Sequence, residues 1–349
     1  MSPPAGPRGP ACADDAVVRL GLNESAYGPL PAVAEVLREG VSDTNRYPDF
    51  LPDDTRARIA QHLRLPGAQV TVGAGATGVA LAVLQAALRR GAARGVDAPE
   101  MLTATPTFDG YPILAEMLGM RLEAVPLDDV GRVDLAAMRA AVTARTVAVV
   151  VCSPHNPTGS VVDESELHEF VRSLPAGVIT VFDEAYVEFS RHSPDLWRLI
   201  RTFDDLLVLR TFSKAYGLAA LRVGYGVGGR QIVTEVRRFE LPFGVGSAAI
   251  AAVPVALAAE DELAQRVRSM RAERDRMADM LRAIGCPVLP SEGNFLFLPG
   301  IEGVAIGHLL RGCGVSTKEC RGHGTRITVG DRSSTDYLVA SLRLTAQTA

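Results

Sequence analysis

Five polar or glycine-rich motifs each follow an apolar run in the first two-thirds of this sequence. The motifs are GAGATG, TFDGY, SPHNPTG, DEAY and SKAYG, after the runs 69–73, 101–106, 146–152, 178–182 and 205–212. If these runs are parallel strands of one sheet, their carboxyl ends meet at one edge, where open α/β sheets bind ligands. The sequence therefore predicts one site that combines a helix-opening turn, aromatic rings, an amide, a carboxylate and an amine.

The amine of this set is Lys214, and the choice of lysine is informative. Lys214 and Lys318 are the only lysines among 36 lysine and arginine residues. An amine can lose its proton and attack an aldehyde to form a Schiff base, whereas arginine, with a pKa above about 12, stays charged. We therefore expect Lys214 to be a nucleophile rather than a solvated surface charge.

The combined motifs fit a cofactor with a phosphate, a protonated ring nitrogen, a ring hydroxyl and an aldehyde, as in pyridoxal 5′-phosphate. Asp183 is expected to pair with the pyridinium nitrogen, so that the ring can act as an electron sink. Asn156 and Tyr186 are expected to hydrogen-bond the ring oxygen, and Phe108 to stack on the ring.

The phosphate of this cofactor is expected at the start of a helix. The amides of Ala76 and Thr77 open that helix, where the macrodipole favours an anion. The side chains of Thr211, Ser213 and Arg222 are expected to complete the phosphate cup. The glycine-rich turn is not a nucleotide P-loop, because G-x-x-x-x-G-K-[ST] is absent. Each motif alone could be only a turn, a helix cap or a surface charge, but those interpretations do not explain why all of them gather at one edge.

Composition narrows the class of protein. The net charge of −4 and pI near 5.9 give no basic footprint for nucleic acid. No apolar run reaches the length of a membrane span, and the N-terminal MSPPAGPRGPACADD, which reads as a disordered lead-in, has no apolar core of a secretory signal. The five cysteines are scattered without C-x-x-C spacing, so we expect no disulfide, no metal site and a cytoplasmic location.

Strand and helix patterns alternate through the part of the chain that carries the motifs, and this predicts βαβ units with a largely parallel sheet. After about residue 244 the pattern changes to a separate α+β unit. It is predicted to contain helices at 246–259, 261–284, 303–312 and 333–345, and strands near 287–290, 294–298 and 325–329. We expect an N-terminal arm and small-domain segment at 1–40, a large cofactor-binding domain at 41–244 and a small C-terminal domain at 245–349.

With these motifs in place, the chain resembles the fold-type-I pyridoxal-phosphate aminotransferases, most closely the histidinol-phosphate aminotransferase group. The resemblance is carried by LNESAYGP (22–29), RYPD (46–49), GAGAT (73–77), PTFDGY (106–111), SPHNPTG (153–159), FDEAYVEF (182–189), RTFSKAYGLAALRVGY (210–225) and TRITVG (325–330). It implies an α/β fold with a mostly parallel seven-stranded sheet between helices, a smaller α+β domain, and a homodimer with shared active sites.

The resemblance also implies substrate contacts. Arg326 is expected to clamp the substrate α-carboxylate, and Asn23 and Tyr27 to lie on a segment that closes over the substrate. Tyr47 is expected to reach the cofactor phosphate of the partner subunit. Lys318 falls where histidinol-phosphate enzymes tend to have a substrate-recognising arginine.

Three departures from the family pattern leave the substrate open. Thr77-Gly78 replaces an acidic continuation of the phosphate motif, Gly244 replaces the usual asparagine of Pro-Phe-Asn, and Lys318 replaces the arginine. The chain is therefore expected to be either an aminotransferase for an amino acid or amino-alcohol phosphate, or a lyase or decarboxylating or deaminating enzyme for an unusual amino acid in specialised biosynthesis, for example of an antibiotic. A non-enzymatic regulator on this fold would need an added DNA-binding segment, for which the residues before LNESAYG are too few.

Overall fold

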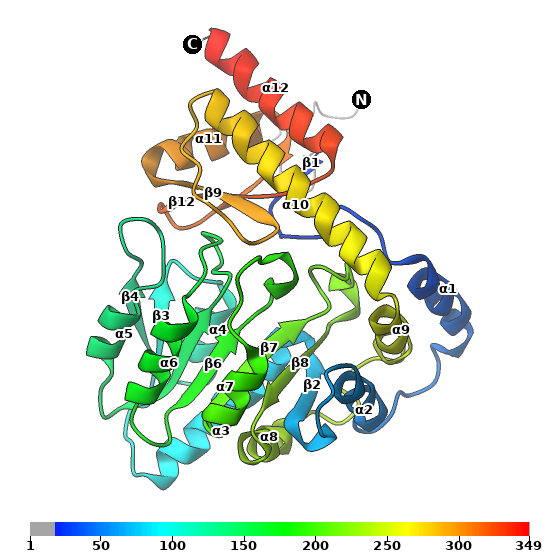
Figure 1. Cartoon of the computed structure of the whole chain (residues 1–349), viewed down its shortest axis with the longest axis vertical. Helices are drawn as coiled ribbons and strands as arrows, with labels where there is room; N and C mark the ends of the chain where they lie inside the picture. Colours follow the sequence, from blue (N-terminus) through cyan, green and yellow to red (C-terminus); the bar gives the residue numbers. More distant parts are fainter. Residues whose placement is uncertain (1–17, 349) are drawn as a thin grey trace, which may run out of the picture.

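The computed structural model describes residues 18–348, and its central feature is a seven-stranded sheet (Figure 1). The strand order is β2-β8-β7-β6-β5-β3-β4, and every neighbouring pair is parallel except those that involve β8. The strands are β2 (Val70–Ala74), β3 (Glu100–Thr105), β4 (Arg121–Pro126), β5 (Thr146–Cys152), β6 (Ile179–Asp183), β7 (Leu206–Thr211) and β8 (Val223–Gly228). The expected α/β fold with a mostly parallel sheet is confirmed.

Helices cover both faces of this sheet, which explains why its strands are apolar on both sides. One face carries α3 (Gly75–Ala93), α4 (Gly110–Met117) and α8 (Arg230–Val236), and the other carries α5 (Leu135–Ala141), α6 (Glu164–Ser173) and α7 (Leu196–Thr202). In β5, Val149 and Val151 pack into the core with α5 and α6, whereas Val150 and Cys152 pack into the core with α3 and α4. Two-sided burial of this kind is typical of parallel strands between helix layers.

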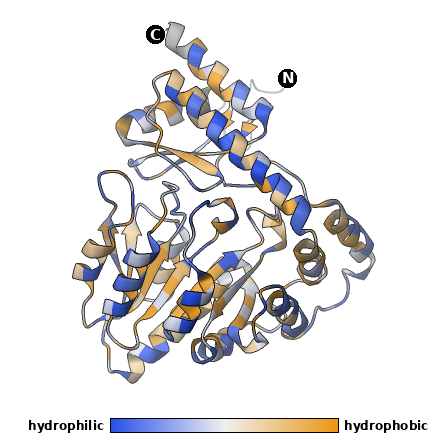
Figure 2. Cartoon of the chain, viewed as in Figure 1, coloured by the Kyte–Doolittle hydropathy of each residue, from blue (hydrophilic) through white to orange (hydrophobic). Residues whose placement is uncertain are grey.

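A smaller three-stranded antiparallel sheet lies beyond the large one and has its own core. Its order is β11-β12-β9, and Leu296, Leu298 and Ile327 pack with helices on it. The elements of this part are α10 (Glu260–Ala283), β9 (Phe295–Pro299), α11 (Gly300–Gly312), β10 (Val315–Ser316), β11 (Lys318–Glu319), β12 (Gly324–Thr328) and α12 (Arg332–Thr348). Figure 2 shows apolar strands in both sheets and alternating polar and apolar turns along α10.

The start of the described chain connects the two parts. Strand β1 (Val18–Arg19) pairs in parallel with β10, and α1 (Pro31–Glu39) packs on α9 (Ser247–Ala258), from which α10 runs to the small sheet (Figure 1). The segment between β1 and α1 thus passes between the two sheets. The remaining helices are α2 (Asp53–His62) and the short 3-10 helices η2 (Gly40–Asp43), η3 (Gly67–Gln69), η4 (Val187–Phe189), η5 (Ala219–Leu221) and η6 (Arg237–Phe239). Residues 1–17, where the lead-in was expected, lie outside the described residues.

Two differences from the sequence expectations have a clear physical reason. No strand forms at 287–290, because Pro287 and Pro290 have no N–H to donate and only Leu289 N bonds across, to Phe297 O at 3.0 Å. Strand β8 was not expected, since VGYGVG is rich in glycine, a poor strand former. No helix within residues 18–348 is long and apolar enough to cross a membrane.

Candidate active site

A cavity of about 300 Å³ lies at the carboxyl edge of the large sheet, where the small sheet faces it. Residues from the ends of β3, β5, β6 and β7 line it, together with the start of α3 and part of β11 and β12. The predicted site residues that line it are Ala76, Thr77, Phe108, Asn156, Asp183, Tyr186, Thr211, Ser213, Lys214, Arg222, Lys318 and Arg326. The structure therefore brings together residues from six of the quoted motifs and Lys318.

Lys214 follows β7, and its amine points into this cavity. Lys214 Nζ donates to the carbonyl oxygens of Leu22 and Asn23, each at 3.2 Å, and lies 5.8 Å from the centroid of the Tyr186 ring. The pKa of Lys214 is lowered to about 8, mainly by burial and next by the positive charge of Arg326, while Glu24 and Asp183 act in the opposite direction. Since an amine must be neutral to attack a carbonyl carbon or to accept a proton, this environment makes Lys214 reactive near neutral pH.

Asp183 ends β6, and three groups hold its carboxylate. Tyr111 OH donates to Oδ2 at 2.5 Å, Ala185 N donates to Oδ1 at 2.9 Å, and Cys152 Sγ lies 3.8 Å from Oδ2. Burial raises the pKa of Asp183, while the hydrogen bond from Tyr111 acts in the opposite direction. A buried carboxylate of this kind favours a cationic partner in the cavity, as a protonated ring nitrogen would be.

The start of α3 provides an anion-binding cradle. Ala76 and Thr77 stand in its first turn, where backbone N–H groups have no partner within the helix. Arg222 Nη1 donates to Ser213 Oγ at 3.4 Å, and Thr211 Oγ1 donates to the same oxygen at 3.0 Å. The hydroxyls of Thr211 and Ser213 and the guanidinium of Arg222 therefore lie together in the cavity that the first amides of α3 also line.

Glycine keeps this cradle open. A Cβ on Gly224 of β8 would lie 2.4 Å from Ala76 N, so only glycine lets β8 approach the start of α3. Arg222 itself has a positive φ of 52°, a strained conformation that is often kept at functional sites. The residues here fit the phosphate-bearing cofactor that the sequence predicts.

Arg326 of β12 is buried at the small-sheet side of the cavity. Its Nη1 donates to Asn156 Oδ1 at 2.5 Å and its Nη2 to Gly21 O at 2.6 Å. Arg326 Nε is buried and has no hydrogen-bond partner among residues 18–348. An orphaned buried donor on a fixed guanidinium indicates a site for an anionic ligand.

Tyr186 connects this arginine to the N-terminal segment. Its hydroxyl oxygen accepts from Asn23 Nδ2 at 3.0 Å and from Asn156 Nδ2 at 3.4 Å. Burial raises the pKa of Tyr186 to about 12, so the phenol is protonated and can itself donate one hydrogen bond. Asn23 is fully buried at this junction but is not part of the cavity lining.

Two other predicted residues lie outside the cavity lining. The ring of Tyr27 packs under the guanidinium of Arg266, 5.7 Å from the ring centroid. Tyr47 is 83% exposed and packs on Phe243 with ring centroids 4.9 Å apart. Both roles, over the substrate and toward a partner subunit, remain predictions.

Three residues that the sequence analysis did not name also contribute to the cavity. Tyr111 holds Asp183, Cys152 lies beside it, and Asp109 forms an ion pair with Lys318 at 2.6 Å. A signal for Cys152 was present, because the last residues of two neighbouring parallel strands, here β5 and β6, must lie side by side. For Tyr111 the signal was its place one helical turn after Phe108, whose ring it meets edge-on at 5.7 Å.

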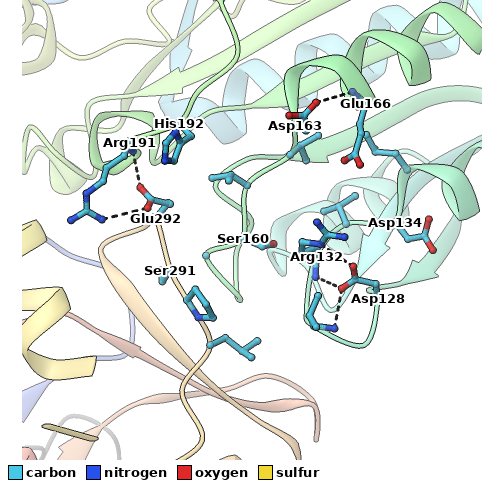
Figure 3. Close-up of a pocket in the computed structure, with 18 of the residues that line it drawn as sticks. Asp128, Arg132, Asp134, Ser160, Asp163, Glu166, Arg191, His192, Ser291 and Glu292 are labelled. Atoms are coloured by element: carbon cyan, nitrogen blue, oxygen red, sulfur yellow. Dashed lines mark hydrogen bonds and ion pairs between the residues drawn. The ribbon is translucent and has the colours of Figure 1, made fainter. Parts of the chain in front are cut away.

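A larger and more open hollow of about 1780 Å³ lies elsewhere between the two parts (Figure 3). Three of its labelled acidic residues are engaged: Glu292 accepts from Arg191 N at 2.7 Å, Asp128 accepts from Arg132 N at 2.7 Å, and Asp163 caps α6. None of the predicted site residues lines it. We therefore place the chemistry in the smaller cavity.

The chain is similar to known proteins over almost its whole length. A family model described as aminotransferase class I and II matches residues 15–342. The chain is 39% identical over 337 residues to the aromatic amino acid aminotransferase of Streptomyces coelicolor, which covers 95% of this chain and 92% of that protein. It is 41% identical over 287 residues to the enzyme of the same name from Mycolicibacterium smegmatis, with 82% and 77% covered.

A solved structure extends the similarity. The histidinol-phosphate aminotransferase from Sinorhizobium meliloti, solved in complex with pyridoxal-5′-phosphate, matches with a TM-score of 0.86 at 26% identity. The match covers 98% of this chain and 95% of that one.

Proposed function

The chain belongs to the aminotransferase class I and II family, and we propose that its amino donor is an aromatic amino acid. It is a pyridoxal-phosphate-dependent aminotransferase, as the family and its relatives establish. The observation that carries the assignment of the site is the position of Lys214, with its lowered pKa, in one cavity with Asp183 and Arg326. The relatives named for aromatic amino acids support the choice of donor.

We assign the cofactor contacts as follows. The amides of Ala76 and Thr77, with Arg222, would hold the phosphate through the helix dipole and charge-assisted hydrogen bonds. Asp183 would hold the ring nitrogen in its protonated form, and Lys214 would hold the aldehyde carbon between turnovers. When bound, pyridoxal phosphate supplies an electron-withdrawing ring that stabilises negative charge on the substrate α-carbon.

The proton transfer falls to Lys214. Once an amino substrate occupies the site, the neutral amine of Lys214 would take the proton from the substrate α-carbon and would then deliver it to the cofactor carbon that carried the aldehyde. A pKa of about 8 lets this amine act in both directions near neutral pH. The carbonyl oxygens of Leu22 and Asn23 orient it, because both accept from Nζ.

Arg326 orients the substrate. Two of its five N–H groups donate to Asn156 and Gly21 and fix the guanidinium, and the remaining donors can bind the α-carboxylate without reorganisation. Phe108 and Leu22 give the cavity apolar walls beside that point. An aromatic side chain would be placed against these walls, with Asn23 and Tyr27 on the segment that covers the substrate.

The direct test is a single half-reaction with the purified holoenzyme and one amino donor at a time. We expect phenylalanine, tyrosine and tryptophan to convert stoichiometrically to their keto acids with loss of the bound aldehyde absorbance. Histidinol phosphate is the comparison substrate. Preferential turnover of histidinol phosphate would refute the aromatic assignment, and catalytic release of ammonia or carbon dioxide with an unchanged cofactor spectrum would establish a lyase instead.

We further propose a homodimer in which Tyr47 completes the phosphate site of the partner subunit. The rings of Tyr47 and Phe50 each pack on the ring of Phe243, with centroid distances of 4.9 and 5.1 Å. All three side chains are at least 43% exposed, so they form a cluster of rings on the surface. Leu241, 69% exposed, extends the apolar surface. Apolar patches of this kind mark interaction surfaces.

Subunit mixing tests this arrangement. Tyr47→Ala and Lys214→Ala are each expected to lower activity strongly. If Tyr47 acts across the interface, a mixed dimer of the two variants contains one intact site, and mixing restores activity. Mixed subunits that remain as inactive as the separate variants would place Tyr47 in its own subunit's site.

We propose the cytoplasm as the location, which fits the free cysteines 152, 286, 313 and 320.

A further inference from the structure

An open hollow of about 930 Å³ lies among the end of α2, η4, α7 and the first half of α10. We call it the Trp197 hollow, and the residues that matter below are Arg64, Glu188, Trp197, Tyr216 and Arg268. None of its lining residues also lines the active-site cavity or the larger hollow between the two sheets. It is therefore a separate place at which a ligand could bind.

Glu188 is a carboxylate of this hollow that lacks a partner. Its Oε2 is buried and accepts no hydrogen bond within residues 18–348. Burial raises the pKa of Glu188 to about 7, and the positive charge of Arg210 acts in the opposite direction. Arg210 cannot serve as its partner, because Arg210 Nη2 already pairs with Glu184 Oε2 at 2.7 Å. A buried carboxylate without compensation favours a cationic group from a ligand.

Two arginines at the same hollow are also free. The side chains of Arg64 and Arg268 are exposed and form no hydrogen bond or ion pair within the described part of the chain. A third arginine, Arg271, is engaged, since it donates to the carbonyl oxygens of residues 188, 189 and 190 at 2.6–3.0 Å. The second carboxylate of the hollow, Glu260, lies 3.2 Å from His62 Nδ1. The unengaged charges are therefore one buried anion and two cations at the rim.

Aromatic rings form the apolar walls of the hollow. Trp197 is the only tryptophan of the chain, and Tyr216 lines the hollow with it. The ring of Tyr216 packs on the buried ring of Phe212 at 4.8 Å, which fixes its position. Leu63 and Val267 add buried aliphatic surface. Walls of this kind favour a flat apolar group.

The charges and the walls select one class of ligand. The two arginines would repel a simple cation, and Glu188 would repel a simple anion. A zwitterion that carries an aromatic ring satisfies both kinds of charge and the apolar walls.

We propose that the Trp197 hollow is a second, non-catalytic binding site for an aromatic amino acid. The ammonium of this ligand binds Glu188, and Arg64 and Arg268 attract its carboxylate. Its ring packs on Trp197 and Tyr216. The charges of the hollow carry this inference, so it does not depend on the amino donor proposed above.

The intrinsic fluorescence of Trp197 tests the proposal, because no other tryptophan contributes. Reduction of the holoenzyme with borohydride first fixes the cofactor to its lysine, so that added amino acids cannot react. Titration with L-phenylalanine should then change the emission of Trp197 in a saturable way. We expect 3-phenylpropionate, which has no ammonium, to bind on the order of 10- to 100-fold more weakly. Phenylethylamine, which has no carboxylate, should bind about two- to fivefold more weakly, because the arginines are exposed.

Two variants of the hollow test its charges. Glu188→Gln keeps the shape of the side chain and should weaken phenylalanine on the order of 10- to 100-fold, without weakening 3-phenylpropionate. Arg268→Met should weaken phenylalanine about two- to fivefold. Arg311→Met is its matched control, since Arg311 is an exposed arginine of α11 that does not line the hollow, and it should change nothing.

Arg326→Met separates this site from the active site, because Arg326 lines only the active-site cavity. The titration should be the same in this variant as in the wild-type protein. The inference is overturned by an emission that does not change with phenylalanine, by equal affinity in the wild-type protein and Glu188→Gln, or by a signal that disappears in Arg326→Met.

Discussion

Replacement of Arg326 by methionine separates substrate binding from chemistry. The change removes the charge and keeps an unbranched side chain of similar length, but Asn156 Oδ1 and Gly21 O lose their donor. Hydrogen bonds to a charged group contribute about 1.5–3 kcal/mol each. For two bonds to the substrate carboxylate, the loss is about 3–6 kcal/mol, which lowers kcat/KM by about 10²- to 10⁴-fold.

How the loss divides between KM and kcat is as informative as its size. The carboxylate is bound in the ground state and the transition state alike, so KM should rise more than kcat falls. Phenylethylamine, which has no carboxylate, is the matched substrate, and its slow turnover should change little in Arg326→Met. Steady-state kinetics with phenylalanine and phenylethylamine measure both effects.

A second consequence follows from charge. Arg326 is the largest electrostatic contribution that lowers the pKa of Lys214, which is about 8. Its removal should raise that pKa, so the alkaline rise in kcat/KM that reports the free amine should move to higher pH. Equal loss toward phenylalanine and phenylethylamine, with no movement of the pH profile, would refute the assigned role of Arg326.

Three other changes give definite outcomes. Tyr111→Phe removes a hydrogen bond that lowers the pKa of Asp183, so the acidic limb of the pH–activity profile should move to higher pH; an unmoved limb would exclude this contact from catalysis. Gly224→Ala places a Cβ 2.4 Å from Ala76 N, and we expect destabilisation of about 1–3 kcal/mol in thermal unfolding together with weaker cofactor binding in a fluorescence titration; an unchanged cofactor affinity would contradict the packing argument. Burial raises the pKa of Glu188 from 4.5 to about 7, so its favourable contribution to stability is fully present below about pH 4.5 and is lost as the pH rises through about 7. Glu188→Gln should therefore raise Tm relative to wild type at pH 8 but not at pH 4, and an equal difference at both pH values would argue against the raised pKa.

Local sequence signals were sufficient for most of the large sheet. The continuous apolar run of β5 and the polar motifs after each strand predicted both the parallel sheet and the edge at which the site forms. Both features can be predicted locally. A strand buried on two faces needs a continuous apolar run, and a ligand site at a strand end needs polar residues directly after that run. The same holds for Lys214, whose type is required by its chemistry.

Contacts between distant segments could not be predicted from such local signals. Strand β8 depends on Gly224, which is needed because the start of α3 lies against it. Gly244, which stands where the family usually has an asparagine, has a local cause instead, since a Cβ there would lie 2.8 Å from Leu241 O. The pairing of Lys318 with Asp109 joins β11 of the small sheet to the residue that precedes α4, and no local pattern indicates it.

The central claim is that Lys214 carries the cofactor, and the composition of the chain allows an unambiguous test. The holoenzyme would be reduced with borohydride, digested and mapped by mass spectrometry for a phosphopyridoxyl group on lysine. Since the chain has only two lysines, the result distinguishes them directly. The account predicts the modification on Lys214 alone, and a modification on Lys318, or on neither lysine of a cofactor-bearing preparation, would contradict it.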